Sequence, residues 1–184
     1  MPSYKAPLDD MRFVLNEVLD VSQLAKLDSF KEVADLETIN SSLDMVAEMA
    51  EEVLQPLNVV GDKEGCKFDP KTRSVTTPPG FKEAYKKFKD AGFTSFACSP
   101  EYGGLGMPVV MSTALSEIVS SANFSFGLYP GLTHGVYTAL EAVGSKELKD
   151  KYLSKLVSGD WSGTMCLTES GAGTELGLIE TTAT

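Results

Sequence analysis

The stretch from Tyr102 to Leu140 contains one formally charged residue, Glu117, and this constrains the fold more than any other feature. A segment so poor in charge either spans a membrane or is covered by protein. A transmembrane helix needs about 20 mainly apolar residues. Residues 118–140, however, include seven Ser, Thr, Asn and His residues, three glycines and Pro130. We therefore reject a membrane span and expect two central helices, at about 108–122 and 125–143, covered by other elements.

Four further segments carry apolar residues at helical spacing. They cover residues 9–19, 36–57, 81–91 and 145–157, and Pro56 and Gly92 are expected to end the second and third of them. The sequence between Val59 and Pro79 is rich in Gly, Asp, Lys, Thr and Pro, which is typical of a loop. The pattern predicts about six helices.

The periodicity changes after Gly159. Trp161, Met165 and Leu167 alternate with smaller or polar residues, and this pattern predicts a strand. The expected fold class is therefore mainly α, with a helical domain at 1–158 that includes an N-terminal extension at 1–35. Residues 159–184 would then begin a β domain, so we expect the chain to be incomplete.

Charge and cysteine content exclude several kinds of function. The 184 residues carry 16 Lys and Arg against 26 Asp and Glu, a net charge of −10, which argues against binding nucleic acid or an anionic membrane surface. Cys66, Cys98 and Cys166 are odd in number and lack metal-ligand spacing, so we expect free thiols. The N-terminal residues show no export signal, and we expect a cytoplasmic protein that binds no metal.

The densest cluster of candidate binding residues runs from Met165 to Gly177. A strand that enters two closely spaced glycines exposes backbone N–H groups, and nearby hydroxyls add donors for a phosphate or a polar ring edge. From spacing alone, a Gly-rich turn between strands is the preferred interpretation. The cluster is neither GxGxxG nor GxxxxGK[ST], which excludes nicotinamide-type Rossmann and P-loop sites.

Two motifs in this order resemble the acyl-CoA dehydrogenase family. The run Pro100–Pro108 (PEYGGLGMP) is similar to a Gly-rich segment of that family, and Lys151–Glu175 is similar to its signature around a Leu-Thr-Glu-Pro-x-Ala-Gly-Ser-Asp core. The resemblance covers most of residues 80–177. The opening Tyr4–Phe13 also resembles one branch of the family, which includes 3-methylmercaptopropionyl-CoA dehydrogenases of the dimethylsulfoniopropionate pathway.

The resemblance implies a dimeric or tetrameric flavoenzyme with FAD held between a helical N-terminal domain, a β domain and a helical C-terminal domain. Such enzymes desaturate an acyl-CoA between Cα and Cβ. A Glu of the C-terminal domain removes the α proton, the flavin accepts the β hydride, and the electrons pass to electron-transferring flavoprotein. The protein positions and polarises the flavin. The catalytic Glu would lie outside this sequence, so we expect residues 1–184 alone to be inactive.

Carried onto this sequence, the resemblance implies a flavin-lining segment. Thr168 would donate to the isoalloxazine edge, Gly171 and Gly173 would permit close backbone approach, and Thr174 would contact the pyrophosphate or the acyl-CoA. The full set of expected cofactor-binding residues is Met165, Cys166, Leu167, Thr168, Gly171, Gly173 and Thr174. Ser170 replaces the family's Pro, Thr174-Glu175 replaces Ser-Asp, and Met165 replaces a frequent aromatic residue.

Other polar residues are expected to be structural. No catalytic base is assigned in this chain, and only Glu117, isolated among neutral residues, is a candidate for a buried and paired acid. His134 and the aromatic residues Phe124, Phe126 and Tyr129 could contact an acyl group, but a core role is preferred for them. A flavin acyl-CoA oxidase and a non-enzymatic acidic helical interaction module remain the alternative functions.

Overall fold

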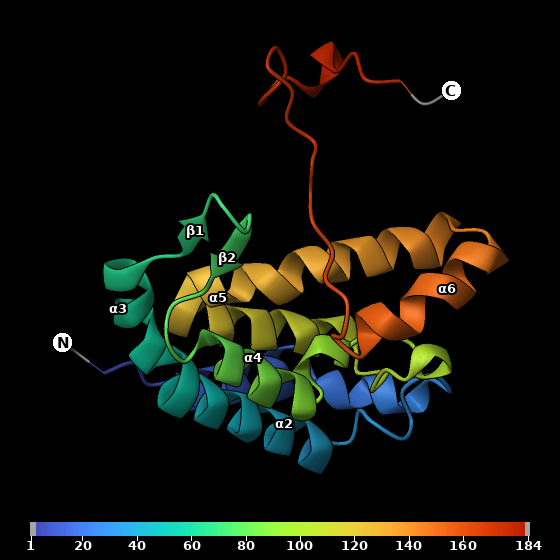
Figure 1. Ribbon diagram of the computed structural model, residues 1–184. Helices are drawn as coiled ribbons and strands as arrows, with labels where there is room; N and C mark the ends of the chain where they lie inside the picture. Colours follow the sequence, from blue (N-terminus) through green and yellow to red (C-terminus); the bar gives the residue numbers. More distant parts are fainter. Residues whose placement is uncertain (1–2, 183–184) are drawn as a thin grey trace.

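The computed structural model describes residues 3–182 and is mainly helical (Figure 1). Each of the six expected helices forms, and the mainly α fold class is confirmed. The elements are α1 (Leu8–Arg12), the π-helical η1 (Phe13–Val18), the 3-10 helix η2 (Val21–Lys26), α2 (Leu36–Glu48), the π-helical η3 (Met49–Leu54), α3 (Gln55–Glu64), α4 (Phe81–Asp90), η4 (Phe93–Ser95), η5 (Pro100–Tyr102), α5 (Val109–Val143), α6 (Lys146–Val157) and η6 (Leu176–Leu178). None of these helices is both long and apolar enough to cross a membrane.

The second expected helix continues beyond Pro56, where the sequence predicts its end. Helix α2, the π-helical turn η3 and α3 follow one another without a break from Leu36 to Glu64. Pro56 lies in the first turn of α3, directly after η3. Pro56 lacks an N–H donor, and it lies where the π-helical hydrogen-bond pattern changes to the α-helical one, so its missing donor does not end the helix. The helix instead ends at Gly65, which has a φ of 59°.

The central pair of helices forms with its break at Asn123. This residue has φ −157° and ψ 89°, which divides α5 into a first half up to Ala122 and a second half from Phe124 to Val143. Figure 1 shows the two halves side by side, running in opposite directions. In agreement, a Cβ added to Gly127 would lie 3.5 Å from Val119.

The expectation that both central helices are covered is wrong for the second half. The first half buries Met111, Ile118 and Val119 in the main core. The second half exposes a row of apolar side chains instead, namely Phe124, Leu128, Tyr129 and Leu132. The second half of α5 is therefore poor in charge although residues 3–182 do not bury it. It presents an apolar surface, a feature typical of interaction sites.

The Gly-rich run Pro100–Pro108 folds back onto η4 and supports the start of α5. Leu105 N donates to Ser95 O, Gly106 N to Cys98 O, and Met107 N to Phe96 O, each at 3.0 Å. Tyr137 of α5 joins this loop, because its hydroxyl accepts from Ser99 N at 2.8 Å. These hydrogen bonds hold the loop before α5 against residues 95–98 and against Tyr137 of α5.

The N-terminal extension packs on the helical core. Met11 and Leu15 are buried with residues of α2 and α5. The carboxylate of Glu51 in η3 accepts from Ala6 N at 2.9 Å and pairs with Lys5. The extension is therefore held in place by both apolar and polar contacts.

The secondary structure differs from expectation in two segments, residues 59–79 and residues 161–167. The segment 59–79, expected to be a loop, is helical up to Glu64 and then forms a short antiparallel hairpin of β1 (Lys67–Asp69) and β2 (Ser74–Thr76). The strand expected around Trp161–Leu167 does not form, since no segment within residues 3–182 pairs with it. A strand is defined by hydrogen bonds to a neighbour, so alternation alone leaves this stretch as extended chain.

Candidate functional site

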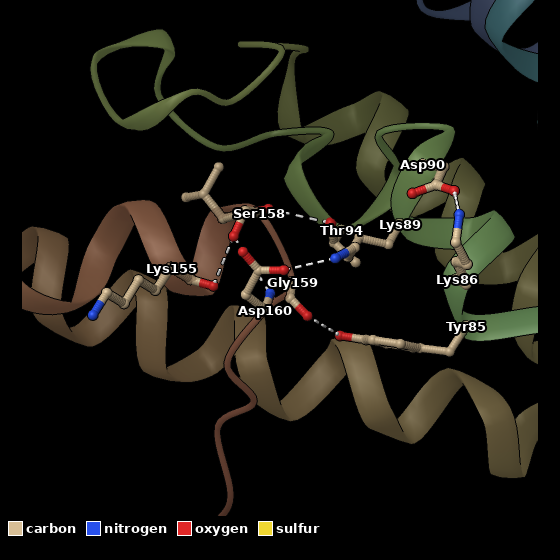
Figure 2. Close-up of polar contacts among 10 residues, drawn as sticks. Tyr85, Lys86, Lys89, Asp90, Thr94, Lys155, Ser158, Gly159 and Asp160 are labelled. Carbon is tan, nitrogen blue, oxygen red and sulfur yellow. Dashed lines mark hydrogen bonds and ion pairs between the residues drawn. The ribbon is translucent and has the colours of Figure 1, made fainter. Parts of the chain in front are cut away.

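The chain leaves the helical body after α6 through a junction that residues of α4 and η4 hold (Figure 2). Gly159 adopts a φ of 72°, and its carbonyl accepts from the Tyr85 hydroxyl of α4 at 3.1 Å. The carboxylate of Asp160 pairs with Lys89 of α4 at 2.6 Å. Thr94 of η4 donates to the carbonyl of Val157 at 3.2 Å.

The ion pair shifts the pKa of both partners. The hydrogen bond from Lys89 is the largest cause that lowers the pKa of Asp160, and the same bond raises the pKa of Lys89. The junction therefore stays ionised on both sides near neutral pH. Lys89 thus anchors the departing chain, whereas Lys82, Lys86 and Lys87 of the same helix are exposed.

The residues after the junction fix the direction of departure. Lys155 lies 4.0 Å from the centre of the Trp161 ring, a cation–π contact. Gly163 N donates to the Thr133 hydroxyl of α5 at 3.1 Å. A Cβ at Gly163 would lie 2.5 Å from Val136, so only glycine allows this close approach. The segment thus starts its course against the second half of α5.

From Thr164 to Thr168 the chain is extended, and among the described residues its backbone N–H groups donate to no protein acceptor. Figure 1 shows this stretch running away from the helices. It ends in a tight turn, in which Glu169 N and Ala172 N each donate to the other residue's carbonyl, at 3.0 and 3.1 Å.

The carboxylate of Glu169 closes this turn. It accepts from Glu180 N and Thr181 N, both at 3.0 Å. Hydrogen bonds from Thr181, and next from the Glu180 backbone, lower the pKa of Glu169. The backbone of residues 180 and 181 thus holds Glu169 as a structural carboxylate.

The structure places the seven expected cofactor-binding residues on this extended segment and turn. All seven are exposed, and Gly171 and Gly173 have no heavy atom within 4 Å of an added Cβ. The antiparallel bridge between Glu169 and Ala172 brings the chain around Thr168 close to the chain around Gly173. The free amide and hydroxyl donors fit the acceptor-rich edge of a flavin and its pyrophosphate, so the residues present are compatible with FAD.

A groove of about 270 Å³ lies between the two halves of α5 and η4. Phe88, Phe93 and Phe96 line it with apolar surface, and Ser112, Ser116 and Ser120 line it with hydroxyls. Gly127, Gly131 and His134 contribute from the second half of α5. Sequence reasoning missed this groove, although serines at every fourth position of the first helix were a visible signal.

Several residues weighed from the sequence lie elsewhere than expected. His134 is exposed and stacks on Tyr137 at 5.9 Å, so the preferred core role is wrong. Glu117 is exposed, which excludes the buried, paired acid. Phe126 is buried, in agreement with a core role, whereas Phe124 and Tyr129 are exposed. Within residues 3–182, no cluster of three or more His, Cys, Asp or Glu side chains could hold a metal.

The three thiols are free, and Cys98 is the buried one. Burial, followed by the charge of Glu141, raises the pKa of Cys98 to about 11. A thiol in that state is not a nucleophile near neutral pH. Cys66 and Cys166 are exposed.

The fold and the motifs define the N-terminal helical part of an acyl-CoA dehydrogenase. The chain belongs to this family, since residues 37–160 match the sequence pattern of the family described as "Acyl-CoA dehydrogenase, N-terminal domain". A 3-methylmercaptopropionyl-CoA dehydrogenase of Ruegeria pomeroyi is 39% identical over 98% of this chain and 30% of its own length. A butyryl-CoA dehydrogenase of Syntrophomonas wolfei is 35% identical over 97% of this chain and 29% of its own length.

A solved structure shows the same fold. The butyryl-CoA dehydrogenase of Megasphaera elsdenii superposes with a TM-score of 0.62 over 75% of this chain and 34% of that chain, at 22% identity. The chain thus spans about 30% of the length of the curated relatives that it matches.

Proposed function

We propose that the full-length protein is an FAD-dependent acyl-CoA dehydrogenase that introduces a Cα–Cβ double bond into an acyl-CoA thioester. The observation that carries this proposal is the segment Met165–Thr174 directly after the junction: its seven expected cofactor-binding residues are exposed, and their backbone N–H groups donate to no acceptor within the described residues. Its position shortly after residues 37–160, which match the family's N-terminal domain, supports the assignment.

In this proposal the residues of the segment bind and orient the cofactor. Thr168 would donate to the ring edge, and the backbone of Gly171 and Gly173 would approach the ring or the pyrophosphate closely. Thr174 would donate to the pyrophosphate or to the acyl-CoA. Met165, Cys166 and Leu167 would line the same face. Bound FAD would supply an acceptor for the hydride that leaves Cβ.

The groove along α5 is the candidate site for the acyl chain. Its phenylalanines provide an apolar floor, and Gly127 and Gly131 leave room beside the helix backbone. The base that removes the α proton would lie in the C-terminal part of the longer protein, and we assign none to residues 1–184. The helical domain is then 1–158, with its extension at 1–35, and a β domain starts at 159.

The proposed substrate is 3-methylmercaptopropionyl-CoA. The 39% identity with the Ruegeria pomeroyi enzyme and the similar N-terminal residues Tyr4–Phe13 support this choice. By family resemblance, the electron acceptor would be electron-transferring flavoprotein, and the protein would be a cytoplasmic homodimer or homotetramer.

The test is a product analysis with the full-length protein. We expect incubation with 3-methylmercaptopropionyl-CoA and electron-transferring flavoprotein to give the α,β-unsaturated thioester, lighter by two hydrogens. Equal turnover with O₂ alone would instead support the alternative of an acyl-CoA oxidase. Absence of product with this substrate and with butyryl-CoA would contradict the proposal and favour a helical interaction module.

A further inference from the structure

Asn123 holds the second half of α5 in place from a fully buried position. Its relative exposure is 1%, and it is one of three buried polar or charged side chains within the described residues. Its backbone is non-helical, with φ −157° and ψ 89°. A polar side chain buried this completely is costly unless all its hydrogen-bonding groups are satisfied.

The side chain of Asn123 makes two kinds of hydrogen bond. Its Oδ1 accepts from Phe126 N at 3.0 Å and from the Ser125 hydroxyl at 2.9 Å, as an N-cap residue does. Its Nδ2 donates to the carbonyl of Leu54 at 3.0 Å. The first set begins a helix, and the second ties that helix to another element.

Leu54 is a fixed point for this attachment. It is the last residue of the π-helical turn η3 and has a relative exposure of 0%. Because η3 continues α2 and leads into α3, a bond to Leu54 O ties the start of the second α5 half to the longest continuous helical rod outside α5. The half-helix can then neither rotate nor slide along that rod without breaking the bond.

We propose that Asn123 is a positioning residue for acyl-CoA binding. Gly127, Gly131 and His134, which line one wall of the groove, follow Asn123 on the half-helix that it begins. The orientation of that wall relative to Phe93 and Phe96 therefore depends on the bond to Leu54. This inference rests on the proposed function, because it takes the groove to be the acyl site.

Two substitutions separate the attachment from the cap. N123D keeps an oxygen for Phe126 N and places a second oxygen against Leu54 O in place of the donor. N123S also keeps a capping oxygen, but is too short to reach Leu54 O. N58D, in the exposed part of α3, makes the same chemical change as N123D without a buried partner.

The experiment measures steady-state kinetics of the full-length protein with 3-methylmercaptopropionyl-CoA and butyryl-CoA. We expect N123D to raise KM about tenfold with kcat within about twofold of wild type and an unchanged visible spectrum. N123S should raise KM about threefold, and N58D should match wild type. If N123D does not fold, the KM and kcat of N123S decide the question.

Three outcomes would overturn the inference. One is an unchanged KM in both folded Asn123 variants, and another is a fall of kcat and kcat/KM by equal factors. Failure of both variants to fold would make Asn123 a purely structural residue. A colourless wild type without turnover overturns the proposed function itself, and is seen before any variant is made.

Discussion

Gly104 faces the backbone of Cys98 so closely that a Cβ at Gly104 would lie 2.0 Å from the Cys98 carbonyl oxygen. We expect G104A to lower the free energy of unfolding by roughly 3 kcal/mol, because either the loop Pro100–Pro108 or the backbone at Cys98 must move. Urea denaturation of the 184-residue chain measures this effect. G135A is the control, since nothing lies within 4 Å of that position in α5, and alanine there should stabilise by roughly 0.5 to 1 kcal/mol. Equal effects of the two changes would contradict the packing described.

The cysteines should differ sharply in reactivity. At about pH 8 we expect a thiol reagent to modify Cys66 and Cys166 rapidly, while Cys98 stays protected by its burial and by its pKa of about 11. Mass spectrometry of the labelled chain identifies the sites, and the same reaction in denaturant should modify all three. Rapid labelling of Cys98 in the native chain would show that the loop around it opens.

The carboxylate of Glu169 should titrate below its ordinary range. Its pKa is lowered by hydrogen bonds from Thr181 and from the Glu180 backbone. Because the folded pKa is the lower one, the contribution of Glu169 to the turn is complete above the ordinary Glu pKa of 4.5 and is lost as the pH falls through the folded pKa. The amide NMR signal of Thr181, followed against pH, should report a midpoint below 4.5. A midpoint at or above that value argues against the closed turn.

Thr168 should matter for flavin retention. In the full-length protein, we expect T168A to weaken FAD binding by roughly tenfold or to shift its visible bands, because a donor to the ring edge is lost. Equilibrium dialysis and absorbance spectra measure both. T164A, four residues earlier on the same extended segment, is the matched control and should behave as wild type. Identical FAD affinity and spectra for T168A and wild type would remove Thr168 from the site.

The helices could be predicted from sequence because each has its own apolar periodicity. Even the break in α5 was expected within a residue or two, since small and polar residues gather around Asn123. The continuation through Pro56 could not, because it depends on the π-helical turn η3, which has no simple sequence signal. The hairpin at Lys67–Thr76 could not be predicted either, because the surrounding residues are those typical of turns and loops.

The candidate site was predicted less completely than the fold. The segment Met165–Thr174 could be found because its glycines and hydroxyls are contiguous and resemble a family motif. The hydrogen bond from Asn123 to Leu54 joins residues that are 69 positions apart, and no local sequence pattern predicts such a contact. For the same reason, the groove between Ser112, Ser116 and Phe93 appears only once the two halves of α5 lie side by side.

The central claim is that the longer protein passes hydride from an acyl-CoA to a flavin held by Met165–Thr174. The most direct test is anaerobic addition of 3-methylmercaptopropionyl-CoA to the purified full-length protein, followed by visible spectroscopy. The account predicts a yellow protein whose flavin absorption is bleached by the substrate. A colourless protein, or a flavin band that neither this substrate nor butyryl-CoA changes, would contradict it.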